Sequence, residues 1–182
     1  MKEESFPKNY SWEILKGLPG TGHIHQFPIG GRSFFREGYV VKVFSNNGNI
    51  WIGNFQGIRN NMGFSGVFST PNPWIICIVA HEEGYLVDVN QPSDYQLIDA
   101  IGIRNVFTIL DLGMLIFVTY TELVSYGSEG KIWETERFGN GEILVADVSK
   151  EGIHGTYWKP EINSYPEFYV NPITGECKLS DS

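Results

Sequence analysis

The most regular feature of this chain is a pattern of apolar and polar positions that recurs five times. In each copy a run of β-branched, aromatic and other apolar residues leads to two to four polar residues and a glycine, and a second such run follows. Glycine enters positive φ at little cost, and tight hairpins between right-twisted strands need that conformation. The pattern therefore predicts five β-hairpins. They cover residues 40–55, 75–89, 122–136, 143–158 and 166–180, with Gly48, Gly84, Gly130, Gly152 and Gly175 in the turns.

The pattern of apolar and polar residues also predicts further strands and two short helical segments. The almost wholly apolar run 74–80 predicts a central strand covered on both faces, and runs 106–110 and 115–120 also have strand character. Ser93 and Gln96 have capping-box spacing before an apolar run, which predicts one short helix near 94–101. Residues 11–16 favour one or two helical turns that end before Gly17.

The spacing of the turns bears on the architecture. Gly84 and Gly130 are 46 residues apart, Gly130 and Gly175 are 45 apart, and Gly152 falls halfway between the last two. Propeller blades of four strands recur every ~40–45 residues. The tetrad Gly-x-Ile-Trp also occurs twice, at 48–51 and 130–133. We expect an all-β fold, an antiparallel sandwich or flattened barrel of successive hairpins, with a small propeller-like array of four-stranded units as the alternative.

Composition supports a folded, turn-rich chain. The 182 residues are 42% apolar and 14% aromatic, which is too apolar for a disordered protein, and the 21 Gly and 9 Pro are spread along the sequence. We expect an irregular N-terminal segment over 1–38, packed on the body, and a single all-β domain over 39–182.

Charge and targeting signals restrict the partners. The net charge of −8 comes from 21 acidic and 13 basic residues without a basic cluster, which disfavours nucleic acid and anionic membranes and favours a basic protein partner. No secretory signal or membrane-length apolar run is evident, which predicts a cytoplasmic protein with reduced thiols. A bridge between Cys77 and Cys177 is the minority alternative.

Motifs for catalysis are sparse. His23 and His25 form an H-x-H pair whose side chains share one face of a strand, so they are candidate ligands for a metal such as Zn²⁺, although a solvated turn is the simpler interpretation. Cys77 and His81 are a second pair, but Cys77 lies in the apolar run and is expected to be buried. No G-x-S-x-G, Walker A or dinucleotide motif occurs, and the sequence predicts no cofactor.

Aromatic residues offer the other candidates. Most of them are expected to fill the β core, but exposed ones would suit a protein or sugar partner. The stretch 155–160 and the alternation in 166–170 make Tyr157, Trp158 and Tyr169 the candidate binding residues.

Three classes of function remain. The favoured one is a non-enzymatic protein–protein interaction domain, an accessory or toxin-neutralising protein that binds a basic partner through its surface. One alternative is a carbohydrate-binding β domain that uses exposed Trp and Tyr. The other is a metal-dependent hydrolase with a loop-borne site that includes His23, His25 or His81. The sequence favours a protein that is not an enzyme and leaves its oligomeric state open.

Overall fold

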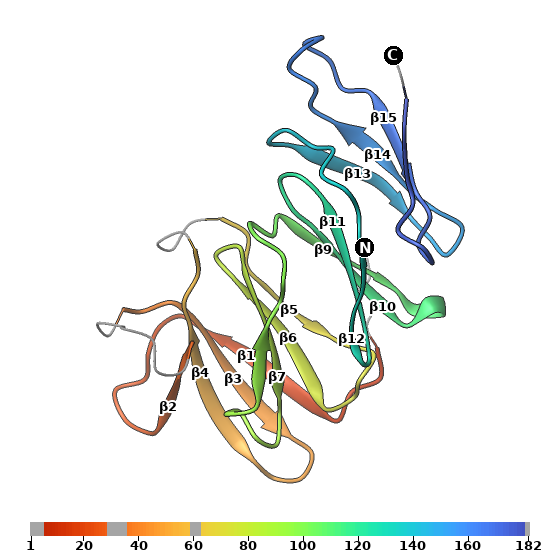
Figure 1. The fold of residues 1–182 in the computed structure, drawn as a ribbon. Coiled ribbons are helices and arrows are strands. Elements are labelled where there is room, and N and C mark those ends of the chain that lie inside the picture. The colour runs from red at the N-terminus through yellow and green to blue at the C-terminus, as the bar shows by residue number, and fades with distance from the viewer. Residues whose placement is uncertain (1–5, 29–35, 59–62, 181–182) are drawn as a thin grey trace. The chain divides into compact units, whose positions relative to one another are not determined.

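The computed structural model describes residues 6–28, 36–58 and 63–180, and these form an all-β fold (Figure 1). They divide into two compact units, an N-terminal unit over 6–99 and a C-terminal unit from residue 100 onward. Each unit contains two four-stranded sheets. The all-β prediction is therefore confirmed, and the four-stranded sheets fit the propeller-like alternative.

The N-terminal unit begins with a sheet in the order β1-β3-β4-β2 and continues with a sheet in the order β5-β6-β7-β8. All neighbours in these sheets are antiparallel except β2 and β4, which are parallel. The strands are β1 (Tyr10–Leu15), β2 (Ile24–Phe27), β3 (Tyr39–Ser45), β4 (Ile50–Phe55), β5 (Gly66–Ser69), β6 (Ile75–Ala80), β7 (Glu83–Asp88) and β8 (Tyr95–Leu97).

The C-terminal unit consists of two antiparallel meanders, in the orders β12-β11-β10-β9 and β13-β14-β15-β16. A single 3-10 turn, η1 (Leu110–Leu112), joins β9 to β10. The strands are β9 (Asn105–Ile109), β10 (Met114–Val118), β11 (Leu123–Gly127), β12 (Gly130–Glu134), β13 (Ile143–Val148), β14 (Ile153–Tyr157), β15 (Glu167–Val170) and β16 (Cys177–Leu179).

Each unit has its own aromatic-rich core. In the N-terminal unit Phe27 stacks on Phe55 with ring centroids 4.3 Å apart, and Tyr85 packs edge-on against both rings. In the C-terminal unit Phe138 contacts Tyr157 and Phe168. Rings of this size dominate the burial of apolar surface, which is the main driving force for folding.

The two Gly-x-Ile-Trp tetrads have the same pattern of buried and exposed residues in the two units. Trp51 and Trp133 are buried, while the isoleucine before each is exposed. The indole N–H of Trp51 donates to the carbonyl of Val89 at 2.9 Å, and that of Trp133 donates to the carbonyl of Pro172 at 2.8 Å. Each bond joins the first sheet of a unit to the loop before the last strand of the second sheet.

The predicted turn glycines have three outcomes. Gly48 and Gly175 have positive φ in hairpin turns, as predicted, and Gly130 has positive φ as the first residue of β12, directly after its turn. Gly152 also lies in a turn, between β13 and β14. There it is favoured by lack of space and not by positive φ, because a Cβ would come within 2.5 Å of the Tyr169 ring. The prediction for Gly84 is wrong, since this residue lies within β7 and pairs with Val79.

The β6–β7 turn is made by two residues that are not glycine. His81 and Glu82 have φ of 46° and 75°, the conformation of a two-residue hairpin turn. The Ser65 hydroxyl accepts a hydrogen bond from the backbone N–H of His81 at 2.9 Å, and Glu82 donates its own N–H to the Phe64 carbonyl. Contacts from another segment therefore hold a turn that the local sequence does not predict.

The predicted helix near 94–101 is wrong. Residues 95–97 form β8, which pairs with β7. The Tyr95 ring packs edge-on against Phe27 with centroids 5.2 Å apart, so pairing with a sheet edge and burial against an aromatic cluster override the capping signal from Ser93 and Gln96.

The segment 1–38, which the sequence predicts to be irregular, contains β1 and β2. The helical turns predicted over 11–16 are also wrong, because β1 runs through Leu15 and pairs with β3. Its first residue, Tyr10, is buried and donates its hydroxyl to the carbonyl of Ile75 at 2.8 Å. That the rest of the chain, 39–182, acts as a single domain stays a prediction.

Both cysteines are free, so the alternative of a bridge between them is wrong. Cys77 is fully buried in β6, as expected for a small residue in an apolar strand. Cys177 is half-buried in β16.

Candidate protein-interaction surface

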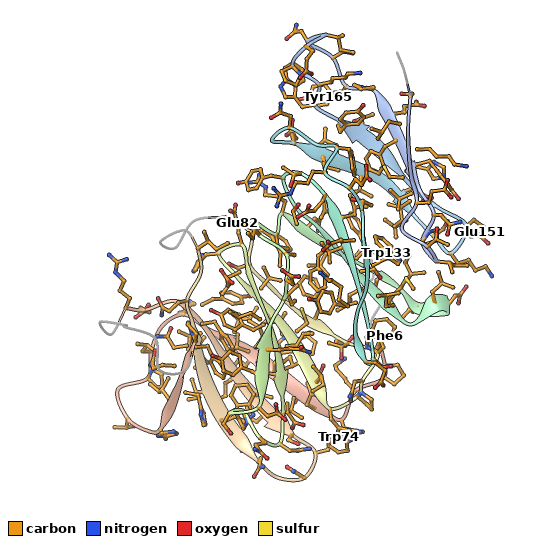
Figure 2. All side chains as sticks on the ribbon, in the orientation of Figure 1. Phe6, Trp74, Glu82, Trp133, Glu151 and Tyr165 are labelled. Carbon is orange, nitrogen blue, oxygen red and sulfur yellow. The ribbon has the colours of Figure 1, made fainter. Side chains whose placement is uncertain are left out.

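The loop between β14 and β15 presents two aromatic rings at the surface of the C-terminal unit. Trp158 and Tyr165 stand near its two ends with ring centroids 5.0 Å apart and planes at 49°. The loop is closed by a bridge between Lys159 and Ser164, and Asn163 has a φ of 50° within it. Tyr165 keeps 44% of its surface exposed (Figure 2). The loop thus holds an aromatic pair in place without burying it.

Glu142, just before β13, completes this arrangement. Its carboxylate accepts a hydrogen bond from the Tyr165 hydroxyl at 2.5 Å, and its backbone carbonyl accepts one from the N–H of Trp158 at 2.9 Å. The hydrogen bond to Glu142 raises the pKa of Tyr165 above its ordinary value. We call Trp158, Tyr165 and Glu142 the aromatic corner. It combines exposed ring faces with a negative charge.

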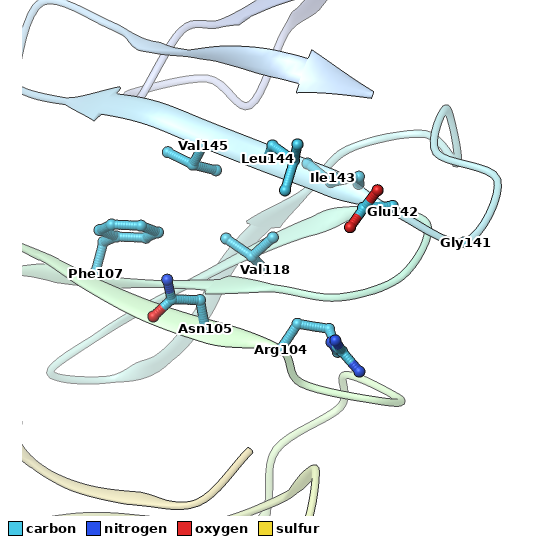
Figure 3. Close-up of a pocket in the computed structure, with 9 residues that line it drawn as sticks. All are labelled: Arg104, Asn105, Phe107, Val118, Gly141, Glu142, Ile143, Leu144 and Val145. Atoms are coloured by element: carbon cyan, nitrogen blue, oxygen red, sulfur yellow. The ribbon is translucent and has the colours of Figure 1, made fainter. Parts of the chain in front are cut away.

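A pocket of about 220 Å³ adjoins the aromatic corner, and Glu142 belongs to both (Figure 3). Phe107 and Val145 lie toward one end of the pocket, and Arg104 and Glu142 lie toward the other. Its lining consists of Arg104, Asn105, Phe107, Val118, Gly141, Glu142, Ile143, Leu144 and Val145. The pocket is therefore mixed: apolar side chains and the Asn105 amide line one end, and charges of both signs stand at the other.

The arginine of the pocket is fixed by an aromatic partner. Arg104 donates from Nη1 to the Tyr120 hydroxyl at 2.7 Å, and its guanidinium lies 4.8 Å from the centroid of the Tyr120 ring. Stacking of this kind suits the planar guanidinium. The positive charge of Arg104 is consequently held on the pocket wall directly before β9.

Charge is distributed unevenly along the chain. Residues 100–182 contain 12 acidic and 6 basic side chains, a net charge of −6, whereas residues 6–99 contain 7 acidic and 6 basic side chains. At least three of the six basic side chains after residue 100 pair with acids, in the ion pairs Lys131–Glu134, Arg137–Glu122 and Lys150–Asp111. The C-terminal unit therefore carries most of the uncompensated negative charge.

The structure separates the three aromatic candidates that the sequence predicts. Trp158 is partly exposed in the aromatic corner, whereas Tyr157 is buried and packs on Phe138 with centroids 5.5 Å apart. Tyr169 is half-buried in β15 beside His154 and donates its hydroxyl to the Glu151 carbonyl at 3.1 Å. Tyr165 is not among the candidates predicted from the sequence, although its place between Ser164 and Pro166 in a turn-rich stretch is a signal for exposure.

The two histidines of the H-x-H pair are close together. The rings of His23 and His25 are 4.8 Å apart, and His25 packs edge-on against Trp51. Burial, and secondarily the proximity of His23, lowers the pKa of His25. Within residues 6–28, 36–58 and 63–180, no group of three or more His, Cys, Asp or Glu side chains could hold a metal ion. The pair therefore gains no third ligand from the described part of the chain.

His81 lies on a different element from that pair. Its Nδ1 is 3.4 Å from the Ser65 hydroxyl in the β6–β7 turn, and burial lowers its pKa. Because the Ser65 oxygen already accepts the backbone N–H of His81, this contact stabilises the turn. Cys77 is fully buried, which raises the pKa of its thiol and makes it a poor nucleophile.

None of the helices described is long and apolar enough to cross a membrane. No protein-family model matches the chain, and no curated protein is significantly similar to it in sequence. Among solved structures, the N-terminal domain of Nup159 aligns with 98% of this chain at a TM-score of 0.44 and 9% sequence identity. The chain spans 51% of the length of that domain.

Proposed function

We propose that this chain is a non-enzymatic protein-interaction domain that binds a basic segment of a partner protein at the aromatic corner. The observation that supports this most directly is the exposed Tyr165 ring, held beside Trp158 by a hydrogen bond to Glu142. A Lys or Arg side chain gains ~0.5–2 kcal/mol over an aromatic face, and a nearby carboxylate adds a charge-assisted contact.

The charge of the C-terminal unit supports the same partner. A net charge of −6 over residues 100–182 would attract a basic partner from a distance and speed its association. Such steering weakens when added salt screens the charges, since the screening length is ~8 Å at physiological ionic strength. An accessory or toxin-neutralising role, in which an acidic surface covers a basic protein, is the process we propose.

The carbohydrate-binding alternative rests on the same rings. A sugar would stack on Trp158 or Tyr165 without needing the charge of Glu142, and its binding would depend little on salt. Salt dependence therefore separates the two functions. The remaining alternative is a metal-dependent hydrolase. Its candidate histidines lie on separate elements, with His23 and His25 at β2 and His81 between β6 and β7.

The test is affinity capture with the whole chain at physiological salt, comparing wild type with Tyr165→Ala and Glu142→Gln. We expect basic proteins to be retained by the wild type, lost at about 0.5 M salt, and reduced at least fivefold with either variant. The control is Ile173→Ala, an exposed residue at the opposite end of β15 that should leave capture unchanged. Equal capture by all four chains, or no salt-sensitive basic protein, would refute the proposal.

A further inference from the structure

The pocket beside the aromatic corner lies between two edge strands. β9 and β13 are each the terminal strand of a four-stranded sheet, so each pairs with one neighbour only among the described strands. The pocket is lined by the start of β9 and by residues 141–145. β13 also shifts register against β14 between Val145 and Asp147, and such bulges are over-represented at sheet edges and next to active sites, where they redirect side chains.

The size of the pocket restricts what it can hold. Pockets for drug-sized ligands usually have ~300–1,000 Å³, whereas an apolar cavity of ~150 Å³ holds a benzene ring. At about 220 Å³, this pocket has room for one large apolar side chain. Phe107, Val118 and Val145 supply apolar contacts for it.

The polar end of the pocket suits the rest of a peptide. Glu142 stands at this end on the wall opposite Arg104, whose guanidinium contacts Tyr120, and the Glu142 carboxylate could accept N–H groups of a bound backbone (Figure 3). Glu142 also connects this end to Tyr165 through their hydrogen bond. A side chain in the pocket and a cation at the aromatic corner would therefore contact the same carboxylate from two sides.

We propose that the pocket is an anchor site for one large apolar side chain of the same basic segment that the aromatic corner binds. This inference rests on the proposed function. It specifies the recognised sequence as an apolar residue, of the size of Leu or Phe, close to Lys or Arg in an extended stretch. The charge of the C-terminal unit brings the segment to the surface, and the pocket selects among basic segments.

The test uses two synthetic peptides of equal positive charge that differ at one central position, which is Phe in one and Ser in the other. Binding to the whole chain is measured by fluorescence anisotropy. Burying a Phe side chain is worth ~1.5–3 kcal/mol, so the Phe peptide should bind at least about tenfold more tightly. Val145→Phe, which fills the pocket, should abolish this difference and leave the affinity for the Ser peptide unchanged.

The matched control is Ala146→Phe, which places the same ring on the next residue of β13, exposed and outside the pocket lining. It should preserve the preference for the Phe peptide. Equal affinities of the wild type for both peptides, or a preference that survives in Val145→Phe, would overturn the anchor site while the aromatic corner stands. Absence of binding by either peptide would instead contradict the proposed function.

A second measurement uses only the wild-type protein, so it does not depend on whether Val145→Phe folds. The methyl groups of Val118 and Val145 line the pocket, and their NMR signals should shift when the Phe peptide is added to the wild type. The Ser peptide should shift them much less. Signals that respond equally to both peptides would overturn the anchor site.

Discussion

The hydrogen bond from the Tyr165 hydroxyl to the Glu142 carboxylate determines what the aromatic corner offers a partner. With its hydroxyl engaged, Tyr165 leaves its ring face as the accessible surface. The carboxylate keeps its charge and further lone pairs for a cation. The hydrogen bond thus joins two residues that are 23 positions apart in the sequence into one surface element.

The pKa of Tyr165 tests this pair. Glu142→Gln removes the negative charge and weakens the hydrogen bond, so the raised pKa of Tyr165 should fall toward the ordinary tyrosine value. A pH titration of the Tyr165 ring by NMR would measure it, with Glu161→Gln in the same exposed loop as control. A pKa that does not change in Glu142→Gln would show that the pair does not form.

At the scale of strands and turns, local signals gave part of the fold. The glycines at 48, 130 and 175 mark hairpins because each needs positive φ, a requirement that the sequence displays directly. The turn at His81 and Glu82 could not be predicted, since distant backbone and side-chain partners hold it. For the same reason β8 looked helical, because its pairing with β7 depends on a neighbour that the local sequence does not reveal.

The site was less predictable than the strands. Trp158 could be selected because it lies in a stretch with turn residues, but the sequence could not distinguish it from its buried neighbour Tyr157. Alternation along β14 places successive side chains on opposite faces, and which face is covered depends on the packing of another sheet. The pocket could not be foreseen at all, as it requires residues 104–107 and 141–145 to approach each other.

Gly155 provides a test of the β13–β14 pairing. A Cβ at this position would come within 2.1 Å of the Leu144 backbone carbonyl, which cannot move without breaking the ladder. Gly155→Ala should therefore lower the free energy of unfolding by at least ~2 kcal/mol in urea denaturation. Gly20→Ala is the control, since a Cβ there meets nothing within 4 Å, and its effect should stay within ~0.5 kcal/mol. Similar stabilities of the two variants would contradict the described packing.

At the scale of the whole molecule, the same long-range hydrogen bond occurs in both units. In each, a tetrad tryptophan donates its indole N–H to a carbonyl 38 or 39 residues further along the chain. The sequence shows the repeated Gly-x-Ile-Trp but not the acceptors, because Val89 and Pro172 occupy different positions in the segments Val-Asn-Gln-Pro (89–92) and Val-Asn-Pro (170–172). The charge, by contrast, differs between the units: residues 100–182 carry a net charge of −6, and residues 6–99 carry −1.

A pair of variants tests the tryptophan hydrogen bond of each unit. Trp133→Phe and Trp51→Phe each leave one loop carbonyl without its donor, which should cost ~1–3 kcal/mol. Hydrogen exchange should accelerate mainly over residues 100–180 in Trp133→Phe and mainly over residues 6–99 in Trp51→Phe. Indistinguishable exchange patterns in the two variants would contradict the assignment of each bond to its own unit.

The unequal burial of the two thiols gives the molecule a built-in reporter. Burial raises the pKa of Cys177 to about 11, yet this side chain retains some access to solvent, so a maleimide would modify it slowly in the native state. Cys77 has no exposed surface and would react only as often as the surrounding strands open. A label could therefore be attached at Cys177 without mutagenesis. The rate at which Cys77 then reacts would measure how often the N-terminal unit opens.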